Sequence, residues 1–134
     1  MRILYDTNVL VAMLSRRESI LDFKKQLEDG TTHISSSFIL AEVEAVLVEK
    51  MKVTKQKAKA AARLLERQST IVQPKKIEKI CRDPFDDYVL AAAVSGSADY
   101  LITSDKDLLV LEKYKGVVIV TSKDFMTASK RSQP

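Results

Sequence analysis

The chain has few of the residues on which most metal and nucleophile sites depend. Among its 134 residues it has one cysteine, Cys81, and one histidine, His33. A cysteine and histidine zinc site needs about four ligands and a catalytic triad needs a base, so most sites of both kinds are excluded. A single cysteine cannot form an internal disulfide, which fits a reducing compartment. We interpret Cys81 as a small buried apolar residue and His33 as structural.

Glycine and proline are also scarce, at three residues each, and tryptophan is absent. With 46% hydrophobic and 30% charged residues, the composition excludes disordered and collagen-like chains and is typical of one globular domain. No segment approaches the roughly 18 apolar residues of a membrane helix, and Asp6 and Asn8 interrupt the apolar core that an export signal needs. We therefore expect a soluble, cytoplasmic protein with one domain over residues 1–127 and a polar, disordered tail over residues 128–134.

Alternating apolar and helical patterns run along the chain. Strands are predicted over residues 3–5, 31–35, 70–72, 100–103 and 117–120. Helices are predicted over residues 8–14, 20–27, 37–51, 54–68, 83–94 and 107–112, with Ser37, Thr54 and Asp83 as N-caps. Strands separated by helices predict an α/β fold, a three-layer α/β/α arrangement with a central, mainly parallel five-stranded sheet.

Two carboxylates follow predicted strands directly, Asp6 after residues 3–5 and Asp105 after residues 100–103. Glu42 and Asp87 lie early in predicted helices, so all four can meet at the edge formed by the carboxyl ends of the strands, where ligands bind in such sheets. Each could instead serve as a helix cap or offset a helix dipole. As a cluster, however, two carboxylates about 5 Å apart repel by about 3 kcal/mol at an effective dielectric constant of about 20.

A cation is therefore expected between these carboxylates. Because histidine and cysteine are so scarce, the expected ion is Mg²⁺ or Mn²⁺, as one or two ions, although sodium or a lysine could substitute less specifically. Such an ion can lower the pKa of an attacking water and neutralise charge on a leaving oxygen, which predicts phosphodiester hydrolysis without a protein nucleophile.

Several motifs resemble those of PIN-domain ribonucleases, in particular the VapC-like toxins of prokaryotic toxin–antitoxin pairs. The resemblance covers nearly the whole chain. It rests on Asp6-Thr7-Asn8, on Ala41-Glu42-Val43, on Asp83-Pro84-Phe85-Asp86-Asp87, and on the run from Ala98 through Thr103-Ser104-Asp105-Lys106-Asp107 to Leu108. Residues 119–125 resemble the last strand and short helix of the family.

The resemblance implies a PIN-like fold, a Mg²⁺- or Mn²⁺-dependent endoribonuclease acting through a metal-activated water, and a homodimer. The four acidic positions of the family correspond to Asp6, Glu42, Asp87 and Asp105; Asp87 is preferred to Asp86 because its spacing from Asp105 matches that of the family. Further positions of the family correspond to Asp86 and Asp107 as auxiliary acids and to Asn8 and Thr103 as polar residues that orient the cluster.

Positive charge is concentrated in residues 50–79, which contain ten basic and two acidic residues, whereas the rest of the chain carries a net charge of −4. Four basic residues recur at every fourth position, and we call them the basic stripe: Lys55, Lys59, Arg63 and Arg67. The stripe is interpreted as a solvated helix face, as a track for an RNA backbone, or as a surface for a cognate antitoxin protein. The eight phenylalanines and tyrosines are scattered along the sequence, which predicts no aromatic platform for RNA.

Other functions remain open at this level. A phosphotransferase of the haloacid-dehalogenase kind also has an aspartate after its first strand, but it needs a second one where Asn8 stands. A PIN-like module that binds RNA or protein without cutting, or a housekeeping RNA-processing nuclease, would use the same fold. The sequence favours an endoribonuclease that is the toxin of a toxin–antitoxin pair.

Overall fold

The computed structural model describes the backbone of residues 1–131, built around one sheet of six strands in the order β3-β2-β1-β4-β6-β5. The strands are β1 (Arg2–Tyr5), β2 (Thr32–Ser35), β3 (Thr70–Ile71), β4 (Tyr100–Ile102), β5 (Lys113–Tyr114) and β6 (Val117–Val120). Neighbouring strands are parallel except β5 and β6. The predicted α/β fold with a mainly parallel sheet is therefore confirmed.

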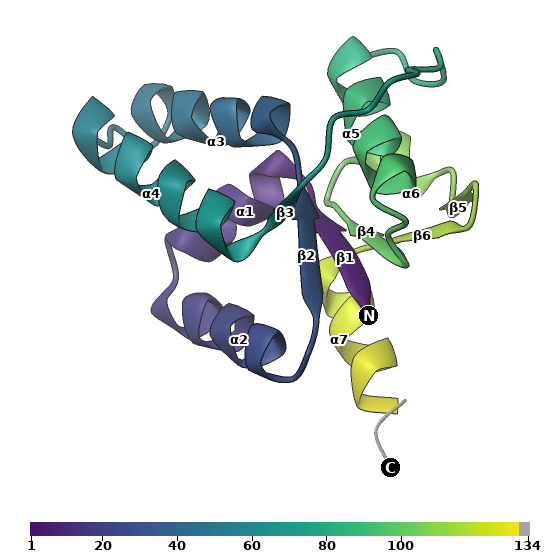
Figure 1. The fold of residues 1–134 in the computed structure, drawn as a ribbon, viewed down its shortest axis with the longest axis horizontal. Coiled ribbons are helices and arrows are strands. Elements are labelled where there is room, and N and C mark those ends of the chain that lie inside the picture. Colours follow the sequence, from purple (N-terminus) through teal and green to yellow (C-terminus); the bar gives the residue numbers. More distant parts are fainter. Residues whose placement is uncertain (132–134) are drawn as a thin grey trace.

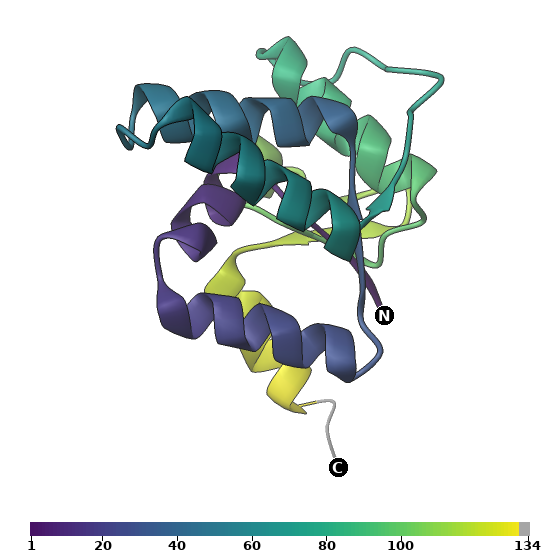
Figure 2. The ribbon, with the colours of Figure 1, turned by 60° about the vertical axis from the view of Figure 1, so that its left-hand side comes forward.

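Helices cover both faces of this sheet. They are α1 (Thr7–Leu14), α2 (Arg17–Glu28), α3 (Ser37–Glu49), α4 (Lys55–Gln68), α5 (Pro84–Ser95), α6 (Lys106–Leu109) and α7 (Ser122–Arg131). In Figure 1, α1, α3 and α4 lie to the left of the strands and α5 and α6 to the right, which gives three layers. Helices α3 and α4 run side by side, as Figure 2 shows from another direction. Within residues 1–131, no helix is long and apolar enough to span a membrane.

The two central strands hold the layers together. The side chains of Ile3 and Leu4 on β1 and of Leu101 and Ile102 on β4 are fully buried. Consecutive residues of a strand point to opposite faces, so both faces of these strands are covered, as is usual in parallel sheets. Short apolar runs in place of alternating patterns are the sequence signal of such strands.

A sixth strand adds to the five that the sequence predicts. Strand β5 has two residues and pairs antiparallel with β6 through a tight turn. Both turn residues, Lys115 and Gly116, have positive φ, at 46° and 87°. Two-residue hairpin turns favour this conformation because it matches the twist of the strands, and glycine adopts it without strain.

One local expectation was wrong. The N-cap of α3 is Ser36, whose hydroxyl accepts a hydrogen bond from the Ile39 N–H at 3.1 Å, and not Ser37. The expected tail over residues 128–134 overlaps the end of α7, which continues to Arg131, and residues 132–134 lie outside the described part. The caps Thr54 and Asp83 are confirmed.

Strand order reverses between β1 and β4, since the chain adds β2 and β3 on one side of β1 and β4 and β6 on the other. Ligands of open α/β sheets bind at such a switch point, beyond the carboxyl ends of the strands. In Figure 1 the arrowhead of β1 points to the region where α3 and α5 begin. The residues that follow β1 and β4 are therefore the candidates for a ligand site.

Candidate functional site

Asp6 lies at the end of β1 and is fixed by three hydrogen bonds. Its backbone N–H donates to the carbonyl of Ile102 at 2.9 Å, which extends the pairing of β1 with β4. Its carboxylate accepts from the Thr7 N–H at 2.7 Å and from the Thr103 hydroxyl at 2.8 Å. Burial raises the pKa of Asp6 above its usual range despite these hydrogen bonds, and the charge of Asp105 adds to the increase. The residue is 4% exposed, so its carboxylate has a single orientation.

Thr103 links Asp6 to Asp105 through two hydrogen bonds. Its side-chain oxygen donates to Asp6 and accepts from the Asp105 N–H at 3.0 Å. Asp105 caps α6, because its Oδ1 accepts from the Asp107 N–H at 2.8 Å. The predicted orienting role of Thr103 thus has a direct geometric counterpart in the bonds it makes to both neighbours.

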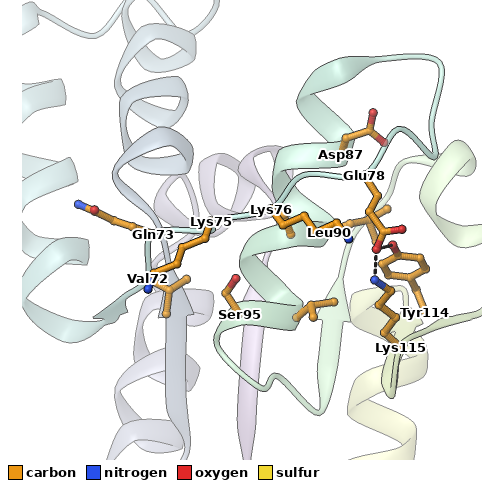
Figure 3. Close-up of a pocket in the computed structure, with 12 residues that line it drawn as sticks. Val72, Gln73, Lys75, Lys76, Glu78, Asp87, Leu90, Ser95, Tyr114 and Lys115 are labelled. Carbon is orange, nitrogen blue, oxygen red and sulfur yellow. Dashed lines mark hydrogen bonds and ion pairs between the residues drawn. The ribbon is translucent and has the colours of Figure 1, made fainter.

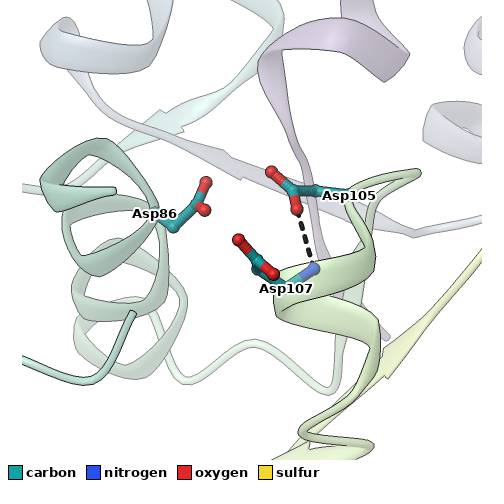
Figure 4. Close-up of side chains that lie close together, drawn as sticks. All are labelled: Asp86, Asp105 and Asp107. Atoms are coloured by element: carbon teal, nitrogen blue, oxygen red, sulfur yellow. Dashed lines mark hydrogen bonds between the residues drawn. The ribbon is translucent and has the colours of Figure 1, made fainter. Parts of the chain in front are cut away.

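Asp105 in turn converges with two further carboxylates, those of Asp86 and Asp107 (Figure 4). One oxygen from each lies within 4.8 Å of the others, and we call these residues the acidic cluster. Asp107 also pairs with the guanidinium of Arg82 at 2.8 Å, at the exposed side of the cluster. The cluster draws on the start of α5 and on the turn after β4, which are about twenty residues apart in the sequence.

Asp86 has the least compensated carboxylate of the cluster. It is 4% exposed, and its Oδ2 has no hydrogen-bond partner among the described residues. Burial, followed by the charges of Asp105, Asp6 and Asp83, raises the pKa of Asp86 to about 7. A buried acceptor without a partner is costly, so this oxygen has a position that suits a bound cation.

Asp87 has a different role in the structure. Its Oδ1 accepts from the backbone N–H groups of Ile80 at 3.0 Å and Cys81 at 2.8 Å. It also lines a cavity of about 540 Å³ between α5, the segment before it and the β5–β6 hairpin (Figure 3). The sequence analysis preferred Asp87 to Asp86 as the metal ligand, whereas the structure brings Asp86 into the acidic cluster and engages Asp87 with backbone.

The remaining predicted site residues lie at the margin. Glu42 is exposed on α3, one turn after the start of the helix, and Asn8 is exposed on α1. Asn8 lines a cavity of about 340 Å³ together with Ser104, the residue before Asp105. Within the described residues neither belongs to the acidic cluster.

The basic stripe is exposed along α4, while Ala58, Ala62 and Leu65 are buried beneath it. Its middle residues Lys59 and Arg63 line a cavity of about 260 Å³ between α4 and α3. The stripe is therefore exposed, with the small apolar residues of α4 facing inward as expected, and this exposure is compatible with all three interpretations of the stripe.

Sequence reasoning missed one feature, a group of three stacked aromatic rings. The Phe38 ring on α3 lies 4.9 Å from that of Phe85 and 4.5 Å from that of Tyr88, both on α5, at interplanar angles of 29° and 26°. We call these three residues the aromatic platform. Phe38 is 40% exposed and Tyr88 39%. The sequence analysis expected no aromatic platform for RNA, because the rings are scattered along the chain. Phe38 is distant from the other two in sequence, and only the fold brings the three together.

Comparison with known proteins places these features in a family. The family model described as PIN domain matches residues 2–107, a range that begins in β1 and ends within the acidic cluster. The chain belongs to the PIN domain family. All the predicted acidic site residues fall inside the matched range.

Solved structures agree with this assignment of the fold. A chain of VapBC2 from Rickettsia felis, whose crystal structure contains a DNA fragment from their promoter, matches this PIN domain with a TM-score of 0.63 and 14% identity, over 89% of this chain and 97% of that one. A chain of VapBC-1 from nontypeable Haemophilus influenzae matches with a TM-score of 0.56 and 17% identity, over 78% and 87%. No protein with curated annotation matches the sequence.

Proposed function

We propose that this PIN domain is a Mg²⁺- or Mn²⁺-dependent endoribonuclease. The observation that carries the proposal is the convergence of Asp86, Asp105 and Asp107 within 4.8 Å, with one buried oxygen of Asp86 unpartnered. Three carboxylates at this separation repel one another unless a proton or a cation lies between them. Membership of the PIN domain family supports the choice of a nuclease among the activities that such a cluster could serve.

The donor set fits a hard divalent cation. All three groups of the acidic cluster offer carboxylate oxygens, and Asp6 lies beside them, held by Thr103. Oxygen ligands of this kind suit Mg²⁺ and Mn²⁺, which retain several waters when bound. The lone histidine, His33, is buried between the rings of Tyr5 and Phe23 and is not part of this donor set.

Each residue has a proposed role. Asp86 and Asp105 hold the ion, with Asp6 oriented by Thr103 as a further ligand and Asp107 as an auxiliary acid shared with Arg82. Glu42 reaches the site from the solvent side, and Asn8 contacts substrate or water at the opposite margin. Asp87 positions the chain around residues 80–81, so we propose Asp86 in the ligand role that the sequence suggested for Asp87.

A divalent ion at this position would supply charge neutralisation at the scissile phosphate and would lower the pKa of the attacking water. The side chains themselves exclude bulk water from the buried face of the site and hold the carboxylates in fixed geometry. None of the proposed residues forms a covalent bond with substrate. Cys81 lies near these carboxylates, but burial and the charges of Asp87 and Asp86 raise the pKa of its thiol to about 11, which disfavours the nucleophilic thiolate.

We further propose that the chain is the toxin of a toxin–antitoxin pair and acts in the cytoplasm as a homodimer. The fold similarity to chains of two VapBC structures supports this role. An antitoxin partner would need to cover the acidic cluster in order to inhibit it. A housekeeping nuclease would use the same acids, and the presence of an adjacent small gene for a DNA-binding antitoxin distinguishes the two.

The decisive experiment is cleavage of end-labelled single-stranded RNA by the wild-type protein and by Asp105→Asn, each with Mn²⁺, Mg²⁺ or EDTA. We expect discrete shorter products from the wild type with metal and none with EDTA or the variant, whose thermal unfolding should stay cooperative. Cleavage that persists in Asp105→Asn would show that the site lies elsewhere. A gel shift without shortening would favour the binding module.

A further inference from the structure

The rings of the aromatic platform come from the same two helices as two acidic residues of the proposed site, Glu42 on α3 and Asp86 on α5. Phe38 and Glu42 are four residues apart on α3 and so share one face of that helix. On α5, Phe85 directly precedes Asp86, and Phe85 and Tyr88 are three residues apart on a common face. Each helix thus contributes one acidic side chain and at least one ring of the platform.

Charged residues of both signs line a cavity beside the start of α3. The cavity between α3 and α4 is lined by Ser37 and Ala41, the residues preceding Phe38 and Glu42, and by Lys59 and Arg63 of the basic stripe. Glu44 and Glu66 line it too, so the cavity itself has no net charge, and Lys59 and Arg63 are the cations that the exposed stripe presents there. A phosphate backbone would be repelled by the acids but attracted by Lys59 and Arg63. A neutral base has no such repulsion at the platform.

Exposed stacked rings are unusual on a protein surface that needs only solubility. Phe38 and Tyr88 pack against each other while keeping about two-fifths of their surfaces open to solvent. Every nucleobase has a flat face that stacks on such rings, and in single strands the bases are free to do so. In a duplex the bases are already stacked and paired.

We propose that the aromatic platform stacks a nucleobase of single-stranded RNA beside the scissile phosphate, while Lys59 and Arg63 contact the adjoining backbone. The inference rests on the proposed function, which supplies single-stranded RNA as substrate, and it assigns a base-stacking site to the rings of Phe38, Phe85 and Tyr88. The platform selects unpaired RNA without reading a particular base, since stacking tolerates all four.

The test uses the lack of tryptophan in the chain. Tyr88→Trp introduces a single fluorescent reporter into the platform, and binding is followed in EDTA so that cleavage is not required. We expect a single-stranded RNA oligonucleotide to quench the tryptophan, whereas duplex RNA and inorganic polyphosphate of equal charge do not. Tyr88→Leu and Phe38→Leu should each weaken single-strand binding about tenfold. Tyr88→Phe, which keeps the ring, and Leu21→Ala, at an exposed apolar residue of α2, should bind as the wild type does.

Three results would overturn the proposal. Equal quenching by duplex RNA or polyphosphate would mean that only the backbone is recognised. Unchanged binding by both leucine variants would remove the platform from the RNA site. Quenching that depends on protein concentration, with loss of a dimer in Phe38→Leu, would show that the platform is an interface between copies. Melting curves identify a leucine variant that fails to fold, and the other then decides. Cleavage without quenching would support the proposed nuclease and contradict RNA binding at the aromatic platform. Quenching without cleavage would support the platform and contradict the nuclease.

Discussion

Asp86 and Asp87 are neighbours in the first turn of α5 and differ in what surrounds their carboxylates. Asp86 has an unpartnered oxygen among other carboxylates, whereas Asp87 accepts two backbone hydrogen bonds. Adjacent helical residues point about 100° apart, so one can face the site while the other anchors a loop. Because α5 is buried on most sides, including Val89, Leu90 and Ala92, its sequence pattern gives no preferred inward direction. This is why the sequence identifies the acidic pair but does not show which member faces the acidic cluster.

Exchange of each residue separates the two roles. Asp86→Asn should abolish metal-dependent RNA cleavage while the protein stays folded, since the amide keeps the shape and loses the charge. Asp87→Asn keeps an acceptor oxygen and should retain most of the cleavage. Asp87→Ala leaves two N–H groups without their partner and should lower the free energy of unfolding by about 2 kcal/mol. Cleavage rates and urea unfolding measure both effects. The reverse pattern, with cleavage lost only in Asp87→Asn, would restore the sequence-based assignment.

His33 is a second residue whose surroundings determine a measurable property. It is 3% exposed on β2, its ring lies 4.1 Å from that of Phe23 and 5.3 Å from that of Tyr5, and its Nε2 is unpartnered among the described atoms. Burial lowers the pKa of His33 to about 4 from 6.5. The unfolded chain therefore binds more protons than the folded one between pH 6.5 and 4, and the contribution of His33 to stability is lost as pH falls through this window.

Replacement by phenylalanine isolates this contribution. His33→Phe keeps an aromatic ring and removes the titration, so its free energy of unfolding relative to the wild type should rise by up to about 3 kcal/mol from pH 7 to pH 4. Asp86 acts in the opposite direction in the wild type, because its raised pKa favours the folded state at low pH. The comparison of the two proteins cancels that effect. A pH-independent difference would mean that the pKa of His33 is the same in the folded and the unfolded chain.

At the scale of elements, the sequence predicted the parallel strands better than it predicted strand β5 or the contacts between helices. The five parallel strands were found because short apolar runs bounded by turns are distinctive. Strand β5 was missed because Lys113–Tyr114 has no apolar pattern, although Lys115-Gly116 is a signal for a tight hairpin. The aromatic platform could not be predicted, because it joins α3 to α5 and no local pattern reports contacts between elements.

The contribution of the positive charge on α4 to RNA binding can be tested by substitution. Lys59→Gln with Arg63→Gln removes the two basic residues of the stripe that line the cavity beside α3. If both contact phosphates of single-stranded RNA, the slope of log affinity against log salt should become shallower by about 1.4. Lys24→Gln with Lys25→Gln, exposed on α2, makes the same charge change as a control. Equal slopes in the two double variants would identify the stripe as a solvated helix face.

At the scale of the whole molecule, the site depends on segments that the fold alone brings together. Asp6 follows β1, Asp86 begins α5 and Asp105 follows β4, and the reversal of strand order between β1 and β4 leaves room for a ligand at this edge. Without a cation the carboxylates repel, so the site opposes the stability of the fold that creates it. An ion bound there would link three segments and reverse the sign of that contribution.

Thermal unfolding measures this coupling without any substrate. Mn²⁺ at about 100 times its dissociation constant should stabilise the wild type by about 2.7 kcal/mol, a rise of about 10 °C in Tm for a chain of this size. Asp86→Asn should lose most of this rise, whereas Asp87→Asn should keep it. In EDTA at pH 8 the order should invert, with Asp86→Asn melting above the wild type, because removing one charge relieves the repulsion in the acidic cluster. An equal Mn²⁺ response in both variants would mean that the acidic cluster is not the ion site. A lower Tm for Asp86→Asn in EDTA would mean that the charge of Asp86 stabilises the metal-free fold, so the cluster is not a source of repulsion that needs a cation.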